Sequence, residues 1–87
     1  MATIAHHVRD ARRRLEAAGL DAGDAAFDAD LLARHALGGW DRARLIARLR
    51  DEAPPGFADR FNPLVARRAT REPAAYILGH REFWRLD

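Results

Sequence analysis

The chain of 87 residues contains no cysteine, no serine and no lysine. Without cysteine it can form neither a disulfide nor a thiolate metal site, which suits a reducing compartment. The hydroxyl groups that could act as nucleophiles belong to Thr3, Thr70 and Tyr76, and none has a histidine and an acid at a spacing typical of a catalytic triad. The sequence therefore predicts no catalytic residue in this chain.

Long apolar runs are also missing, and His6, His7 and Arg9 interrupt the first eleven residues. The sequence has no candidate membrane span and no secretory signal. We therefore expect a soluble cytoplasmic protein without a membrane partner. A chain of this length forms one domain, and it buries only about 60 to 65% of the surface that its unfolded form exposes.

The histidines and glycines form no recognisable ligand site. Adjacent His6 and His7 point about 100° apart on a helix, and His35 and His80 are isolated, so no metal site is predicted. The six glycines occur as separated singles and one pair, which is neither a dinucleotide fingerprint nor a phosphate loop. No cofactor-binding residue is expected in this chain.

All fifteen basic residues are arginine, and thirteen acids interleave with them, so the formal net charge is only +2. Abundant arginine and alanine are typical of a GC-rich genome. Arginines could contact phosphates, but Asn62 is the only amide side chain available to read bases. The pattern argues against nucleic-acid binding, although a small arginine-rich nucleic-acid-binding module stays an alternative.

Periodicity and capping residues predict an all-α fold with about five helices. The first three helices begin at residues whose side chains can cap a helix N-terminus, which are Thr3, Asp21 and Asp41. Glycine or proline ends each of them, at Gly19, at Gly38 with Gly39, and at Pro54 with Pro55.

Each of these helices has apolar residues that we expect to face the core, and those of the first helix recur at steps of three and four residues. They are Ile4, Val8, Ala11, Leu15 and Ala18, then Phe27, Leu31, Leu32 and Leu37, and finally Leu45, Ile46 and Leu49. Three acids in the first half of the second helix, Asp24, Asp28 and Asp30, are expected on a solvated face, where the positive helix end favours them. Asp30 is also placed to pair with Arg34, four residues on.

The fourth segment allows two interpretations. Its apolar residues fit one helical face from about residue 56 to 70, but Pro63 lies inside this run and costs about 3 kcal/mol in the middle of a helix. Alternatively, Asn62 caps a new helix with Pro63 as its first residue, and Phe57 to Phe61 form a separate turn. We favour a kink or break near Asn62.

The last segment combines a helix start, a helix stop and a strand pattern. Pro73 can begin a short helix that runs to Leu78, and Gly79 can end it. Residues 82–86 are aromatic and extended in character. We expect a helical domain over residues 1–80 and the start of a linker hairpin over residues 81–87.

Two stretches, residues 15–38 and 67–86, resemble the N-terminal domain of the bacterial release-factor glutamine methyltransferases. The second stretch carries the specific motifs, which are Glu72-Pro73, Tyr76-Ile77, Gly79 and Glu82-Phe83-Trp84. The resemblance covers nearly the whole chain and is weakest over residues 51–62. The chain departs from the family pattern at Pro63, where the family has continuous helix, and at Arg71, where glycine is frequent.

This resemblance implies a bundle of about five helices joined through a β-hairpin to a methyltransferase domain that uses S-adenosylmethionine. Such enzymes methylate the glutamine of the Gly-Gly-Gln motif in peptide-chain release factors. The family's cofactor loop and catalytic motif lie downstream of the matching region. We therefore expect a front module of a larger protein, without a cofactor and without activity of its own, whose partners are a release factor and its own C-terminal methyltransferase domain.

The resemblance also implies a physical role, which is to orient the release factor relative to the catalytic pocket. Trp40, Arg67, Arg68 and Arg71 are the candidate contact residues on an exposed surface. Tyr76 and Phe83 are expected to pack rather than to recognise a partner. A structural cap that only stabilises the catalytic domain is the alternative.

Overall fold

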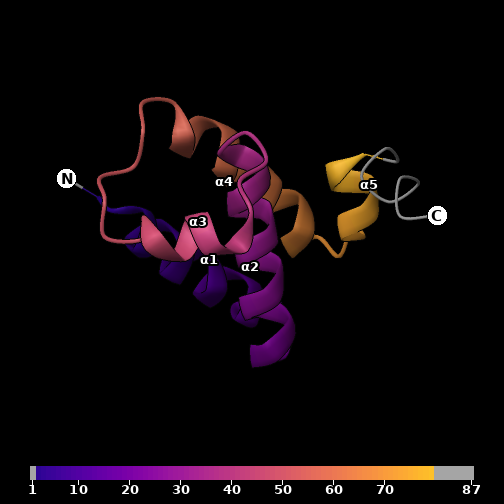
Figure 1. The fold of residues 1–87 in the computed structure, drawn as a ribbon. Coiled ribbons are helices and arrows are strands. Elements are labelled where there is room, and N and C mark those ends of the chain that lie inside the picture. Colours follow the sequence, from indigo (N-terminus) through magenta and orange to yellow (C-terminus); the bar gives the residue numbers. More distant parts are fainter. Residues whose placement is uncertain (1, 80–87) are drawn as a thin grey trace.

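The computed structural model describes residues 2–79 (Figure 1). Five helices follow one another, α1 (Ile4–Ala17), α2 (Ala22–Ala36), α3 (Arg42–Ala47), α4 (Phe57–Ala69) and α5 (Ala74–Leu78). Within the described residues there is no strand, only an isolated antiparallel bridge between Thr3 and Glu52. The predicted all-α fold is confirmed. The expected extended segment over residues 82–86, with Glu82, Phe83 and Trp84, lies outside the described residues.

Helix α2 is the centre of the bundle, because it packs against all four other helices. In Figure 1, α3 and α5 lie on opposite sides of it. One face of α2 is a stripe of small buried residues, Ala25, Ala29, Ala33 and Ala36, with Leu32 among them. Small side chains let the neighbouring backbones approach closely, and large side chains such as Leu15 of α1 and Phe61 of α4 complete the core without any solvent exposure.

The three predicted N-terminal caps are confirmed. Each cap oxygen accepts a hydrogen bond from the backbone N–H three residues on, Thr3 from His6 at 3.1 Å, Asp21 from Asp24 at 2.7 Å, and Asp41 from Arg44 at 2.7 Å. The first turn of α1 has two further partners, because the N–H groups of Ile4 and Ala5 donate to the carbonyls of Asp51 (3.0 Å) and Leu49 (2.9 Å). These bonds hold the segment after α3 against the start of α1.

Helix α4 is a single helix of 13 residues with Pro63 inside it, so of the kink or break expected near Asn62 the break is wrong. Phe57, Phe61 and Val65 on one face are fully buried. Burying three such side chains contributes about 1.5 to 3 kcal/mol each, which outweighs the cost of about 3 kcal/mol for the proline. The carbonyl of Asp59, which Pro63 leaves without its helical partner, belongs to an exposed residue.

Two arginines of α4 align it antiparallel to α2. Arg60 Nε donates to the carbonyl of Ala36 at 2.8 Å, and Arg68 Nε donates to Asp28 Oδ2 at 2.8 Å. The first bond satisfies a carbonyl in the last turn of α2, which has no partner inside its own helix. Together they fix which end of α4 lies beside which end of α2.

Helix α5 begins after Pro73, which is its N-cap residue, and Gly79 ends it. The short helix predicted from proline and glycine is therefore confirmed, with proline one position earlier than the first helical residue. Within the described residues, no helix combines the length and apolar character that crossing a membrane requires.

Candidate partner-binding surface

Arg68 is not on an exposed surface, in contrast to its expected role as a contact residue. Its side chain is 19% exposed and pairs with Asp28, whose side chain is 10% exposed, at 2.8 Å. The expectation that Asp28 lies on a solvated face is wrong for the same reason. A buried carboxylate needs a charged partner, and α4 places a guanidinium beside it. The pair joins α2 to α4 and leaves neither group free for a protein partner.

Arg67, one helical position earlier, forms an exposed pair with Glu72. Arg67 Nε donates to Glu72 Oε1 at 3.0 Å, and Arg67 Nη2 donates to Oε2, so the contact is bidentate. The hydrogen bonds from Arg67 lower the pKa of Glu72 below its ordinary value, and its charge acts in the same direction. This pair bridges the turn between α4 and α5.

Arg71 occupies the position after the C-cap of α4 with a left-handed φ of 74°. The backbone there forms a Schellman turn, because Arg71 N donates to the carbonyl of Arg68 and Glu72 N donates to that of Arg67. This left-handed conformation favours glycine, because glycine has no Cβ to clash. The Arg71 guanidinium lies over Gly19, where an added Cβ would come within 2.5 Å of Nη2.

Trp40 lies at the other end of α2 from Arg71. It follows the C-terminus of α2, its carbonyl accepts from Arg34 Nε at 3.0 Å, and the Arg44 guanidinium stands 4.5 Å from its ring centre. Because α2 has 15 residues and rises about 1.5 Å per residue, roughly 20 Å of helix separates the two. Trp40 and Arg71 therefore lie near opposite ends of α2. Arg34 was predicted to pair with Asp30, but its side chain donates to the carbonyl of Trp40.

The motifs that carry the family resemblance, from Glu72 to Trp84, are described as far as Gly79. Tyr76 is 60% exposed, whereas its neighbours Ile77 and Leu78 are buried against the core. Leu78 also lines a small hollow of about 110 Å³ together with Trp40 and Leu31, so α5 reaches the Trp40 end of the bundle. The expectation that Tyr76 packs rather than recognises a partner stays a prediction.

The main feature that sequence reasoning missed is an apolar groove between α1, α2 and α3. It has a volume of about 460 Å³. Phe27 of α2 is 66% exposed and Ile46 of α3 is 56% exposed, although both were expected in the core. Leu45 lines the same groove from a buried position. We call this feature the Phe27 groove.

A signal in the sequence could have placed Phe27 correctly. At 100° per residue, Phe27 lies about 200° around the helix from Ala25, and so opposite the stripe of buried alanines. The alanine stripe was the true packing face of α2, whereas the prediction followed the larger side chains. Helix α3 has only six residues and buries only Leu45 among them, which leaves the adjacent Ile46 outside.

Arginines surround the Phe27 groove and continue along α1. Arg12, Arg34 and Arg42 line the groove with one acid, Asp30, whose Oδ2 lies 3.8 Å from Arg42 Nε. Arg9, Arg12, Arg13 and Glu16 line the adjoining surface of α1. Within residues 2–79, Arg9, Arg12 and Arg13 have no ion-pair partner. The surface is therefore apolar at its floor and positive at its rim.

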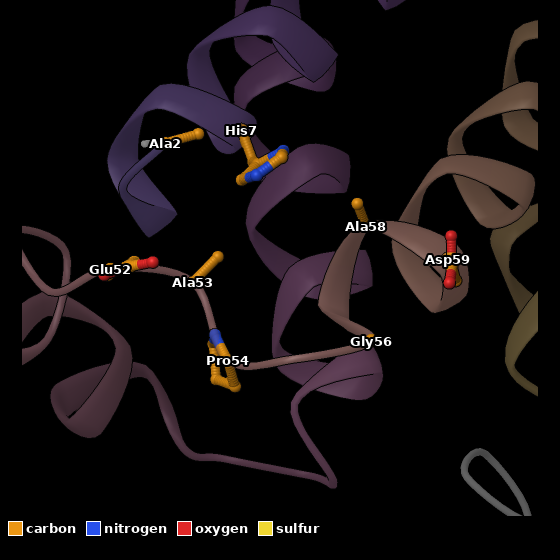
Figure 2. Close-up of a pocket in the computed structure, with 8 residues that line it drawn as sticks. All are labelled: Ala2, His7, Glu52, Ala53, Pro54, Gly56, Ala58 and Asp59. Atoms are coloured by element: carbon orange, nitrogen blue, oxygen red, sulfur yellow. The ribbon is translucent and has the colours of Figure 1, made fainter.

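A second hollow, of about 240 Å³, lies between the start of α1 and the α3–α4 connection. Figure 2 shows that His7 points from α1 toward this connection, whereas Glu52 and Asp59 lie at opposite sides of the hollow. The His7 ring meets the edge of Phe57 at 5.4 Å between ring centres. The polar groups do not converge on one point, so the hollow has no arrangement for chemistry.

The described residues offer no catalytic or metal-binding cluster. No group of three histidine or acidic side chains in residues 2–79 could hold a metal ion. Thr3 Oγ1 caps α1, and Thr70 Oγ1 donates to the carbonyl of Arg67 at 2.7 Å. Glycines of the described segment lie at or beside helix ends rather than in a loop that could surround a nucleoside, so these residues do not fit S-adenosylmethionine.

Five short helices form a small all-helical domain. Its main surface feature is the open, apolar Phe27 groove with its positive rim. Residues 7–79 match the family model described as the PrmC N-terminal domain. The chain belongs to this family, which confirms the resemblance seen in the sequence. No significant match to a solved structure was found.

Similar proteins include three named release factor glutamine methyltransferase. The one from Cereibacter sphaeroides is 47% identical over 77 residues, which cover 88% of this chain and 27% of the relative. The one from Rhodospirillum rubrum is 46% identical over 74 residues, or 85% and 22% of the two chains. The one from Corynebacterium glutamicum is 41% identical over 87 residues, or 100% and 29%. The chain thus spans about a quarter of the length of these relatives.

Proposed function

We propose that this chain is the helical N-terminal domain of a methyltransferase that acts on the glutamine of the Gly-Gly-Gln motif in peptide-chain release factors. In this proposal the domain recognises and positions the release factor and takes no part in the chemistry. The observation that carries it is the match of residues 7–79 to a family whose similar proteins are named release factor glutamine methyltransferase.

The surface of the domain supports a binding role. Phe27 and Ile46 are large apolar side chains that remain exposed in the same groove. Exposed apolar groups that lie together, with polar groups around them, are typical of sites that a protein partner covers. The proposal assigns S-adenosylmethionine to the methyltransferase domain of the full-length protein. That methyltransferase domain is the second partner of this chain, after the release factor. The proposal places the protein in the cytoplasm, where release factors act.

Steady-state kinetics of the Cereibacter sphaeroides relative, with and without the region that matches this chain, test the proposal. Loss of a recognition domain raises KM for the release factor, while turnover at saturating release factor changes little. A domain that only caps the catalytic part predicts lower solubility and an unchanged KM. An unchanged KM in a soluble, folded truncated enzyme would therefore overturn the recognition role.

A further inference from the structure

We propose that the Phe27 groove is the docking site for an acidic amphipathic helix of a protein partner. This inference deepens the proposed function and rests on it for the identity of the partner, the release factor. Its first basis is the floor of the groove. Phe27 of α2 and Ile46 of α3 are two of the three large apolar side chains exposed in residues 2–79, and they line the same groove.

Three helices line the groove, with Val8 and Arg12 on α1, Phe27 on α2 and Ile46 on α3. An amphipathic helix lays side chains at spacings of three and four residues into such a groove. Apolar anchors that enter between Phe27 and Ile46 would remove both side chains from water, which supplies the main favourable term for association.

The rim determines the charge of the occupant. Arginines on all three helices face the groove or the adjoining surface of α1, and they outnumber the acids there, which are Asp30 and Glu16. Arg42 already has Asp30 beside it, but Arg12 has no ion-pair partner within the described residues. Carboxylates on either side of an apolar stripe would meet these guanidinium groups.

Two other occupants fit less well. In a symmetric dimer built on this groove, the same patch of both copies would face each other, so each positive rim would meet the other. Nucleic acid would satisfy the arginines but would leave Phe27 and Ile46 without apolar partners, since phosphate contacts dominate such interfaces. An acidic amphipathic helix satisfies both the floor and the rim.

Isothermal titration with two probes tests the proposal on the whole chain. The first probe is a purified bacterial release factor, and the second is a synthetic helical peptide with leucines on one stripe and glutamates beside it. Phe27→Ala and Ile46→Ala are each expected to weaken binding of both probes about tenfold, because central apolar contacts carry most of the affinity. Arg12→Glu is expected to weaken binding about fivefold and to reduce its dependence on salt.

Arg50→Glu is the matched control, since Arg50 is exposed and does not line the groove. It should change affinity less than twofold, and circular dichroism should show that all variants remain folded. A version of the peptide with lysine in place of glutamate should not bind. Equal binding of the glutamate and lysine peptides would overturn the proposal that the occupant is acidic. A dimer in sedimentation that Phe27→Ala dissociates would also overturn it. So would binding of duplex DNA that Arg12→Glu abolishes and Phe27→Ala leaves unchanged.

The two probes separate this inference from the function on which it rests. Release factor that binds equally well to the parent and to Phe27→Ala supports recognition and overturns the groove as its site. Peptide binding that Phe27→Ala weakens, without any release-factor binding, supports the groove and overturns the proposed function. Failure of both probes overturns both.

Discussion

The buried pair between Asp28 and Arg68 is expected to be the most sensitive polar contact of the fold. The perturbation is Asp28→Ala, which removes the carboxylate and leaves the Arg68 guanidinium without its partner at 2.8 Å. The pair also joins the central helix α2 to α4. Its loss therefore acts on one of the two contacts that hold the two helices in register.

The expected magnitude follows from burial. Removing one partner of a buried pair costs about 3 to 5 kcal/mol. Because the Arg68 side chain keeps 19% of its exposure, water can partly solvate the orphaned charge, and we expect about 3 kcal/mol. A domain of this length has a total stability of about 4 to 13 kcal/mol. The melting temperature should fall by about 12 to 24 °C.

The assay is urea unfolding followed by circular dichroism, with Asp30→Ala as the control. Asp30 lies on the same helix, but its partner Arg42 is 74% exposed at 3.8 Å, so its loss should cost less than about 1 kcal/mol. The double variant Asp28→Leu with Arg68→Met should recover most of the lost stability, since apolar side chains can replace a buried pair. Equal destabilisation by Asp28→Ala and Asp30→Ala would refute this reasoning.

Three further results are expected. Arg71→Gly should be more stable than Arg71→Ala by about 1 kcal/mol in urea unfolding, because both lose the guanidinium but only glycine relieves the left-handed φ of 74°; equal stabilities would contradict this. In NMR titrations Glu72 should titrate below the ordinary glutamate range, and in Arg67→Ala it should return to that range. The stability that this pair contributes is therefore present above the ordinary range and is lost as the pH falls through the lowered pKa of Glu72. An unchanged Glu72 titration in Arg67→Ala would exclude Arg67 as the cause of the lowered pKa. Phe27→Ala should change the free energy of unfolding by less than about 0.5 kcal/mol, whereas Phe61→Ala should cost about 3 to 5 kcal/mol; similar costs would mean that Phe27 is buried in solution.

Local signals in the sequence predicted most helix boundaries, but α3 ends at Ala47, well before the stop predicted at Pro54 with Pro55. Thr3, Asp21 and Asp41 were identified as caps because a capping side chain acts on a backbone N–H three residues away, which the sequence alone specifies. The left-handed φ at Arg71 is a conformation that favours glycine. The sequence showed Arg71 as a departure from the expected family pattern, but it did not show the backbone conformation at that residue.

Contacts between helices were predicted less well, since they depend on how the helices are arranged. Asp28 was expected in water because the opposing Arg68 lies 40 residues away in the chain. Pro63 was expected to kink or break α4, but α4 is one continuous helix, which burial of Phe57, Phe61 and Val65 stabilises. The groove was missed because apolar character alone does not tell a core residue such as Leu32 from an exposed one such as Phe27.

The most direct test of the account is an NMR titration of the isotope-labelled chain with a bacterial release factor. The account predicts saturable shift changes that cluster at the Phe27 groove, on the facing surfaces of α1, α2 and α3 around Arg12, Phe27 and Ile46. Residues at the opposite side of the bundle, such as Ala75 of α5, should stay unchanged. No shift change at high release-factor concentration would contradict the claim that this domain recognises the release factor.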